Sequence, residues 1–410
     1  MRALRTILLT LATVLAALLL VAAGVWIGGR HADAVPSPVR SALTGSTDRR
    51  IVNEALDRIE EIYYRKIPRS VLADEAIAGA VKNLNDRFST YFTPAEYHRF
   101  QDAQDSRFTG VGVSVQQDKD GLRIVSVYDG SPAKRGGIAP GDVIVAAGGK
   151  KLAGLDSEKS TALIKGPAGT DIALEVRHKG VTKKLTLTRS RISVPVVAST
   201  MRVVCGKKIG VVSLSQFSSG AHAEVYRALE RLRARGAEGY VFDLRGNGGG
   251  LVDEAQLIAS AYLQDGVVVT TKGRTVPERR LEATGRPVVP MGAPVAVLVD
   301  RDTASASEIV AGALQDRGRA TLVGTRTFGK GVFQEVIELS NGGALDITAG
   351  QYFTPSGRNL GGRGVSQGRG LEPDVRAKDN PKTRVDEARR IALSTVAAEL
   401  GCATAAPSRP

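Results

Sequence analysis

The chain has 410 residues, of which 42% are hydrophobic and 24% are charged, and its formal net charge is +14. This length exceeds one ordinary hydrophobic core, so two or three domains are expected, and the composition is that of a folded globular protein. The basic residues are spread along the chain without a dense run or interleaved aromatic side chains, which argues against binding of nucleic acid. Attraction to anionic lipid near a membrane anchor accounts for the charge better.

The first residues have the pattern of an export signal. Arg2 and Arg5 precede an uncharged apolar run, Thr6 to Ile27, which is long enough to cross a bilayer as a helix. Its length favours an uncleaved anchor, although Ala32-Asp33-Ala34 has the small-x-small form that signal peptidase accepts. Residues 1–34 are therefore a signal anchor or a signal peptide. We expect a single-pass membrane protein whose folded part is extracytoplasmic, or a secreted protein if the signal is cleaved.

Cysteine and histidine are scarce. Only Cys205 and Cys402 are present, so there is no disulfide framework, and the sequence leaves open whether the two pair. No Cys/His cluster has the spacing of metal ligands, so neither a metal nor another cofactor is expected.

Residues 35–106 read as a linker followed by helices. Residues Val35 to Thr47 are rich in Pro, Ser and Thr, which is typical of a linker. Apolar residues then recur at helical spacing, which predicts helices over Asp48–Arg65, Val71–Leu84 and Pro94–Gln104. This segment shows no catalytic constellation of residues. Its helices are expected to be packing or pairing surfaces, which leaves open a homo-oligomer formed through them.

Residues 107–189 predict a small, mainly β domain. Valines alternate with small residues after Phe108, Ser131 can cap a short helix that begins at Pro132, and Pro140-Gly141 forms a turn. A helix over Ser157–Lys165 and strands over Asp171–Arg177 and Thr182–Thr188 follow. The order resembles a PDZ domain in the circularly permuted form common in bacterial proteases. The alternative is a small β domain that only packs.

The PDZ resemblance implies a peptide-binding loop. In such domains a glycine-rich loop presents backbone N–H groups to a peptide's C-terminal carboxylate, and the peptide adds a strand to the sheet edge. The residues that match this loop are Gly110, Val111, Gly112 and Val113.

Residues 190–385 alternate between strand and helix, which predicts an α/β core, and residues 386–410 read as a C-terminal helix and tail. The fold class is therefore an α/β core with an inserted, mainly β PDZ domain and an N-terminal helical segment after the membrane or signal helix. The predicted strands are Ile209–Leu214, Gly239–Leu244, Pro294–Val299 and Thr321–Gly324, and the helices are Ala221–Arg235, Leu251–Tyr262 and Ser305–Gln315.

The glycine run Gly246-Asn247-Gly248-Gly249-Gly250 lies between a predicted strand and a helix. It lacks the phosphate-loop form, and no acidic residue follows at dinucleotide spacing, so a nucleotide cradle is not indicated. Glycines here allow positive φ and leave N–H groups free to bind an anion. Such a loop can form one half of an oxyanion hole.

Ser305 is the candidate nucleophile, at the point where a strand turns into a helix whose first amides are unpaired. A Ser-His-Asp arrangement is not indicated, because three of the four histidines precede the core and His222 is expected to be a solvated side chain at a helix start. Lysine is the alternative base, provided that its site favours the neutral amine. Ser307, the competing nucleophile, is expected to cap or pack the helix.

Lys330 is the candidate base. It lies between two glycines among Phe328, Val332 and Phe333, and desolvation lowers the pKa of a lysine. On an extended strand Gln334 points to the same face as Lys330, so its amide can hold the amine. The alternative for Lys330 is a surface cation on a turn.

Together these residues resemble the carboxyl-terminal processing proteases, PDZ-containing serine peptidases of the S41 type. The resemblance implies Ser305 as nucleophile, Lys330 as base and Gln334 as its orienting group, with oxyanion donors at the Ala306 amide and a glycine amide of the Gly248–Gly249 region. The family usually has Asn-Asn-Pro-Gly-Gly in the glycine loop, so this chain leaves open which glycine donates. The motifs that carry the resemblance, in order, are Phe108–Val113, Ser131–Asp142, Asp243-Leu244-Arg245, Ser305–Ile309, Thr327–Gly331 and Tyr352–Gly357.

The resemblance implies an exported serine endopeptidase that binds apolar C-terminal tails of protein substrates and cleaves near that end. One alternative is a non-catalytic exported PDZ scaffold, which has no need of an intact Ser, Lys and Gln set. Another is an acyl-CoA-type hydratase or thioesterase, which the export signal and the missing nucleotide site argue against.

Overall fold

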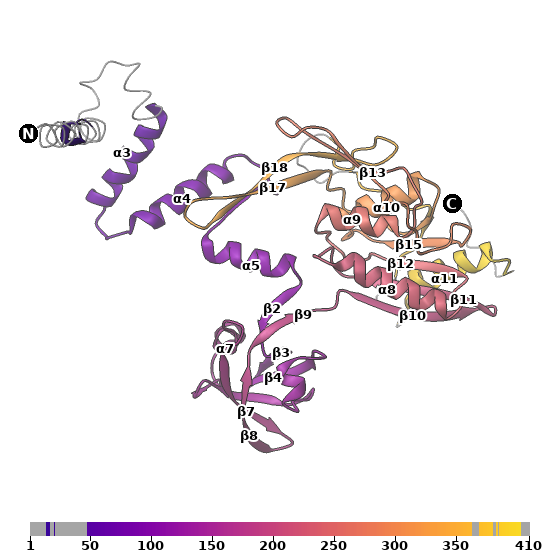
Figure 1. Ribbon diagram of the computed structural model, residues 1–410, viewed down its shortest axis with the longest axis horizontal. Helices are drawn as coiled ribbons and strands as arrows, with labels where there is room; N and C mark the ends of the chain where they lie inside the picture. Colours follow the sequence, from indigo (N-terminus) through magenta and orange to yellow (C-terminus); the bar gives the residue numbers. More distant parts are fainter. Residues whose placement is uncertain are drawn as a thin grey trace, which may run out of the picture. The chain divides into compact units, whose positions relative to one another are not determined.

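The computed structural model describes residues 14–16, 20, 47–362, 369–379, 383 and 385–402, in two compact units divided after Leu84 (Figure 1). The predicted membrane run Thr6–Ile27 lies outside the described residues apart from positions 14–16 and 20. Within the described part, no helix combines the length and the apolar character needed to cross a bilayer.

The first unit contains the helices α3 (Thr47–Ile62) and α4 (Arg69–Lys82), close to the predicted bounds. α3 contacts α4, but no residue of α3 is buried. Ile51, Val52 and Ile59 recur along α3 at helical spacing and stay exposed. The helix therefore carries an apolar stripe that the described residues of the unit do not cover.

The start of the second unit differs from the all-helical segment that the sequence predicted. α5 (Pro94–Gln104) is present and begins with Thr93, whose amide donates to Glu96 Oε2 over 2.9 Å. Before it, however, lies a strand, β1 (Thr90–Phe92), which pairs with β18 (Ala344–Phe353) in the register Tyr91↔Leu345. Residues near position 90 therefore join a sheet of the core.

The inserted β domain has the predicted elements. Its sheet has the order β3-β4-β5-β7-β8, with β6 paired to β5, and its core centres on Leu122, Ile144 and Leu174. β2 (Arg107–Gly110) and β9 (Ser190–Ser193), which lead into and out of the domain, pair with each other. The elements between them are β3 (Val113–Asp118), β4 (Gly121–Val127), α6 (Pro132–Arg135), β5 (Val143–Ala147), β6 (Lys150–Lys151), α7 (Ser157–Ile164), β7 (Asp171–His178) and β8 (Val181–Thr188).

The α/β core is built on a sheet of order β10-β11-β12-β15-β16-β19, in which all pairs are parallel except β10 with β11. Its strands are β10 (Val197–Val204), β11 (Lys207–Leu214), β12 (Gly239–Asp243), β15 (Val295–Val299), β16 (Thr321–Gly324) and β19 (Val375–Arg376). Its helices are α8 (Ala221–Ala234), α9 (Val252–Ser260), α10 (Ala306–Asp316) and α11 (Glu387–Glu399).

Helices cover both faces of this sheet. Phe242 and Val297 pack with α8, α9 and α10, whereas their neighbours Val241 and Leu298 pack with α11. Burial on both faces explains why these strands are continuous apolar runs rather than alternating ones. The sequence separated residues 386–410 from the core, whereas the structure packs α11 against the core sheet.

A second core sheet was not predicted. It joins β1, β18, β13 (Val267–Gly273) and β14 (Arg279–Glu282), and β17 (Val332–Glu338) pairs with the other edge of β18. A bulge in the β17–β18 pairing lies between Phe333 and Gln334. This sheet carries the segment that follows Lys330.

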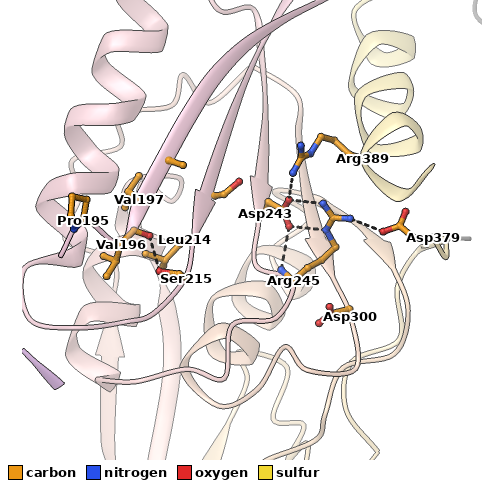
Figure 2. A pocket seen from close by; sticks show the side chains of 12 residues that line it. Pro195, Val196, Val197, Leu214, Ser215, Asp243, Arg245, Asp300, Asp379 and Arg389 are labelled. Carbon is orange, nitrogen blue, oxygen red and sulfur yellow. Dashed lines mark hydrogen bonds and ion pairs between the residues drawn. The ribbon is translucent and has the colours of Figure 1, made fainter. Parts of the chain in front are cut away.

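An ion-pair cluster joins α11 to the carboxyl end of β12 (Figure 2). Arg245 Nη2 lies 2.7 Å from Asp243 Oδ2. Arg245 Nη1 lies 2.9 Å from Asp386 Oδ1, at the start of α11. Arg389 of α11 also reaches Asp243 Oδ2, over 3.2 Å. The hydrogen bond with Asp243 is the main cause that raises the pKa of Arg245, so this guanidinium stays protonated, and the carboxylates of Asp243 and Asp386 balance the charges of the two arginines.

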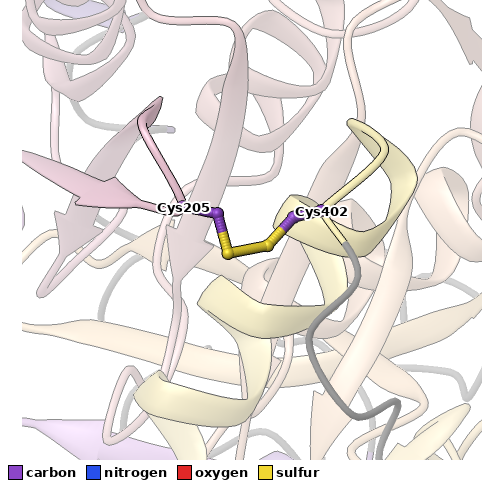
Figure 3. Close-up of a disulfide and its surroundings, with 2 residues drawn as sticks. All are labelled: Cys205 and Cys402. Carbon is purple, nitrogen blue, oxygen red and sulfur yellow. A yellow bond between two sulfur atoms is a disulfide. The ribbon is translucent and has the colours of Figure 1, made fainter.

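A disulfide fixes the other end of α11 (Figure 3). Cys205, at the turn between β10 and β11, is bonded to Cys402, which follows α11, with the Cα atoms 6.1 Å apart. Cys205 and Gly206 both have positive φ, 48° and 75°, as a two-residue hairpin turn requires. The bond closes a loop with a sequence separation of 197 and so restricts the unfolded chain strongly.

Replacing both cysteines by serine is expected to lower the free energy of unfolding by about 2–5 kcal/mol, because the long loop is no longer closed in the unfolded state. Urea unfolding of the oxidised protein, the reduced protein and the Cys205→Ser/Cys402→Ser protein measures this. Reduction should destabilise the wild type and leave the double variant unchanged. Equal midpoints for all three proteins would show that the bond contributes nothing.

Candidate active site

Ser305 is the N-cap of α10, directly after the loop that follows β15. Its φ of 58° and ψ of −118° are an unfavourable conformation for a residue with a side chain. Such strain costs about 1–3 kcal/mol and is found chiefly at functional sites. The turn places Ser305 beside the unpaired amides of a helix start, as the sequence predicted.

Glu308 is the central acceptor of this site, and its side chain is fully buried. Its Oε2 accepts from the amides of Ser305 and Lys330, both over 2.9 Å, and its Oε1 accepts from the Gly329 amide over 2.8 Å and from Thr327 Oγ1 over 2.5 Å. Because the two amides share one oxygen, the backbones of Ser305 and Lys330 are neighbours. Burial raises the pKa of Glu308, and these hydrogen bonds oppose the rise.

Glu308 was not predicted from the sequence as a site residue. A signal for it existed, because Ser305 and Glu308 have the Ser-x-x-Glu spacing of a capping box. Here the carboxylate reaches beyond the cap to the loop that carries Lys330.

The glycine loop is held against Ser305 by Asn247, a buried residue. Its Nδ2 donates to Leu214 O over 2.9 Å, and its carbonyl accepts from the Ala304 amide and from Ser307 Oγ. Ser307 is fully buried and makes this contact over 2.9 Å. Ser307 thus packs the helix against the loop, which is the role predicted for it.

The two candidate oxyanion glycines, Gly248 and Gly249, differ in their contacts. Gly249 lies so close to the nucleophile that an added Cβ would come 2.8 Å from Ser305 Cβ and 3.0 Å from the Ala306 amide nitrogen. Its own amide, however, donates to Asn247 Oδ1 over 2.9 Å. Gly248 is exposed at the surface of the loop. Gly249 is therefore needed for close approach while its own amide is occupied, and the oxyanion role of Gly248 stays a prediction.

Lys330 is largely buried and its amine donates to Gln334 Oε1 over 2.7 Å. Gln334 in turn donates from Nε2 to Thr348 Oγ1 over 3.0 Å, which fixes the orientation of its amide. Burial lowers the pKa of Lys330, as predicted, and the carboxylates of Asp346, Asp86 and Glu308 oppose this. The structure therefore brings Lys330 and Gln334 together and does not leave Lys330 as an exposed cation.

Ser305 and Lys330 are close in backbone but are not joined through their side chains. Among the residues that the structure describes, no hydrogen bond links Ser305 Oγ to Lys330 Nζ. Catalytic hydrogen bonds are often long in a free enzyme and shorten when substrate binds.

A cavity of about 460 Å³ lies beside the Asp243–Arg245 cluster (Figure 2). Neither Ser305 nor Lys330 lines it. The site is therefore identified by side-chain geometry and not by this hollow.

His222 is partly solvated, as predicted, with 37% of its side chain exposed, but its ring also has a carboxylate partner. Its ring Nδ1 lies 2.9 Å from Glu254 Oε2, and its amide donates to the same oxygen over 2.7 Å. His222 starts α8, as expected, but it ties that helix to α9.

The loop predicted to bind peptide lies between β2, which ends at Gly110, and β3, which begins at Val113. Gly112 has a φ of 84°, and a Cβ there would come 2.2 Å from Ser131 Cβ, so only glycine fits. Val111 is buried and its carbonyl accepts from the Ala133 amide. In the described part of the domain β3 pairs only with β4, so its outer edge is open to an added strand.

Comparison with known proteins identifies the class. The model of Peptidase family S41 matches residues 208–377, and that of the PDZ domain matches residues 109–188. The carboxyl-terminal-processing protease of Synechocystis sp. is 37% identical over 295 residues, which are 71% of this chain and 69% of that protein. The carboxy-terminal processing protease CtpA of Bacillus subtilis is 32% identical over 341 residues, 83% of this chain and 71% of that protein.

A solved structure is also similar. The photosystem II D1 C-terminal processing protease shares 27% sequence identity, with 85% of this chain and 97% of that chain covered and a TM-score of 0.49.

The fold and the family matches define a PDZ-containing protease of serine type. The chain belongs to the carboxyl-terminal processing proteases of Peptidase family S41. The predicted family and the predicted α/β core with an inserted PDZ domain are confirmed, whereas the membrane or signal helix stays a prediction.

Proposed function

We propose that this protein is an exported endopeptidase that binds the apolar C-terminal tails of proteins through its PDZ domain and cleaves near that end. Ser305 is the nucleophile, Lys330 the general base and Gln334 the group that orients the base. The observation that carries the proposal is the buried Glu308 carboxylate, which holds the amides of Ser305 and Lys330 on one oxygen while the lysine amine meets Gln334.

The reaction proceeds by acyl transfer. Lys330 Nζ accepts the proton of Ser305 Oγ as that oxygen bonds to the peptide carbonyl carbon. The amides of Ala306 and Gly248 stabilise the negative oxygen of the tetrahedral intermediate. The peptide C–N bond then breaks and the ammonium of Lys330 protonates the leaving amine. A water molecule, deprotonated by Lys330, hydrolyses the ester on Ser305 and restores the free serine.

Recognition of C-termini is supported by the open edge of β3 and by the loop Gly110–Val113. Free amides in such a loop can bind a terminal carboxylate while the peptide pairs with the strand. The Synechocystis and Bacillus relatives are named for carboxyl-terminal processing, which agrees with this proposal.

An extracytoplasmic location is supported by two features. Disulfides such as Cys205–Cys402 persist in oxidising compartments, and the run Thr6–Ile27 has the length and apolar character of an anchor. Digestion of intact cells or spheroplasts with an added protease should remove the folded part. Full protection, with degradation only after lysis, would contradict export.

Self-association through α3 is proposed because Ile51, Val52 and Ile59 form an apolar stripe that stays exposed among the residues described in the first unit. A second copy presents the same stripe, and its burial would stabilise a pair of chains. Light scattering should give a smaller assembly for Ile51→Lys/Ile59→Lys than for the wild type, and an unchanged mass would argue against this surface.

The test of the proposed function compares peptides that end in apolar residues with the same peptides amidated at the C-terminus. The full-length protein should cleave the free-acid peptides faster, as followed by mass spectrometry. A fluorophosphonate probe should label the wild type but not Ser305→Ala. Ser307→Ala tests the competing serine and should keep the label unless the buried contact is needed for folding, which its melting curve reveals. Binding of tails without labelling or cleavage would favour a non-catalytic scaffold.

A further inference from the structure

The amine of Lys330 faces residues 86–89, a segment of the chain that precedes β1. Lys330 Nζ lies 4.9 Å from the centroid of the Phe88 ring. The ring is held in place by Asp86, whose Oδ1 accepts from the Phe88 amide over 2.9 Å and whose Oδ2 accepts from Ser89 Oγ over 2.6 Å. One carboxylate thus folds the segment into a turn that presents an aromatic ring to the amine.

The same carboxylate is connected to the amine by hydrogen bonds. Ser89 Oγ accepts from the Thr348 amide over 3.0 Å. Thr348 Oγ1 accepts from Gln334 Nε2, and Gln334 Oε1 accepts from Lys330 Nζ. The group that orients the base is therefore itself positioned through Thr348 and Ser89 by Asp86.

We propose that Phe88 and Asp86 are positioning residues that set the proton affinity of Lys330, an inference that rests on Lys330 being the general base. A ring face and a carboxylate both stabilise an ammonium, whereas burial destabilises it. Burial alone would make the amine a weak base. The ring and the carboxylate restore part of the basicity, so that the amine, which burial keeps neutral at working pH, can still take the proton of a serine.

Other charged groups also act on Lys330, and Asp86 differs from them. Glu308 and Asp346 favour the ammonium as well, but Glu308 is occupied by backbone amides, and burial raises the pKa of Asp346. Although burial also raises the pKa of Asp86, hydrogen bonds from Ser89, Thr348 and Phe88 bring it below its ordinary value, so this carboxylate stays charged. Arg87 is the cation of the segment, with Cζ 5.4 Å from the centroid of the Phe88 ring.

The test is the pH dependence of kcat/KM for Phe88→Leu and Asp86→Asn. Each change removes a group that favours the ammonium, so Lys330 loses its proton at lower pH. The acid limb of the profile should move to lower pH by about one unit, a tenfold change in proton affinity. Phe88→Tyr keeps the ring face and should keep the wild-type limb. Phe100→Leu and Asp102→Asn remove a nearby aromatic ring and an exposed carboxylate on α5 and should also leave the limb in place.

A second readout does not depend on turnover. In the Ser305→Ala protein, the rate at which acetic anhydride acetylates Lys330 is followed against pH by peptide mass spectrometry. Phe88→Leu and Asp86→Asn in that background should bring the rise in rate to lower pH by the same amount. If the acetylation rate of these variants rises at the wild-type pH, the inference is overturned. Slow cleavage by Phe88→Leu or Asp86→Asn would not rescue it, because a merely structural role lowers kcat without moving the acid limb of the pH profile. The proposed function fails separately, through full turnover by Lys330→Ala.

Discussion

Lys330→Ala is expected to lower kcat by roughly 10⁴-fold or more, because the neutral amine is the group that takes the proton of Ser305. Lys330→Arg should be equally inactive, since a guanidinium is not deprotonated in proteins and cannot act as a base. The arginine variant carries the charge of the protonated form of Lys330 opposite Asp86 and Asp346. It therefore separates loss of the base from loss of the charge.

The pH dependence of the wild-type rate tests the same assignment of Lys330 as the base. Burial lowers the pKa of Lys330, so the neutral amine forms below the ordinary lysine value of about 10.4. The rate should rise with pH through this lowered pKa and reach a plateau when the amine is neutral. Steady-state cleavage of a tailed peptide measures both the variants and the profile. Wild-type turnover by Lys330→Ala, or an acid limb at the ordinary lysine pKa, would refute the assignment of the base.

The parallel sheet and its helices were predictable because their signals are local. A strand buried on both faces, such as Gly239–Asp243, is a short apolar run, and the glycines after it mark a turn into a helix. The start of α10 at Ser305 was predicted in the same way. The contact of Lys330 with Gln334 was also predicted, but not for the right reason, because Lys330 precedes β17 and a bulge before Gln334 breaks the strict alternation of an extended strand.

The second sheet was not predictable in this way, because its pairings join distant segments. The contact between Ser89 and Thr348 spans a sequence separation of 259, and no sequence pattern near residue 89 predicts it. β17 also lacks clean alternation, and a bulge shifts its register at Gln334. For the same reason the sequence gives no hint that Asp86 and Phe88 lie beside the base.

Glu308→Gln is expected to lower kcat by about 10²–10³-fold, as loss of a preorganised hydrogen-bond network does, while leaving both Ser305 and Lys330 present. A glutamine has a single acceptor oxygen, and its NH₂ would point at amides or a hydroxyl that are themselves donors. Three amides and the Thr327 hydroxyl now share the two oxygens of Glu308. At least one buried donor would lose its partner, at a cost of about 1–3 kcal/mol each.

The effect of Glu308 on rate and its effect on stability can be measured apart. Urea unfolding gives the stability, and kcat at a temperature where both proteins are folded gives the rate. Glu335→Gln makes the same substitution on the exposed part of β17 and should change neither. Because Glu308 fixes the backbone on both sides of the reacting pair, its loss should lower kcat more than it raises KM for the tailed peptide. A Glu308→Gln protein with wild-type kcat would show that the geometry of Ser305 and Lys330 does not depend on this carboxylate.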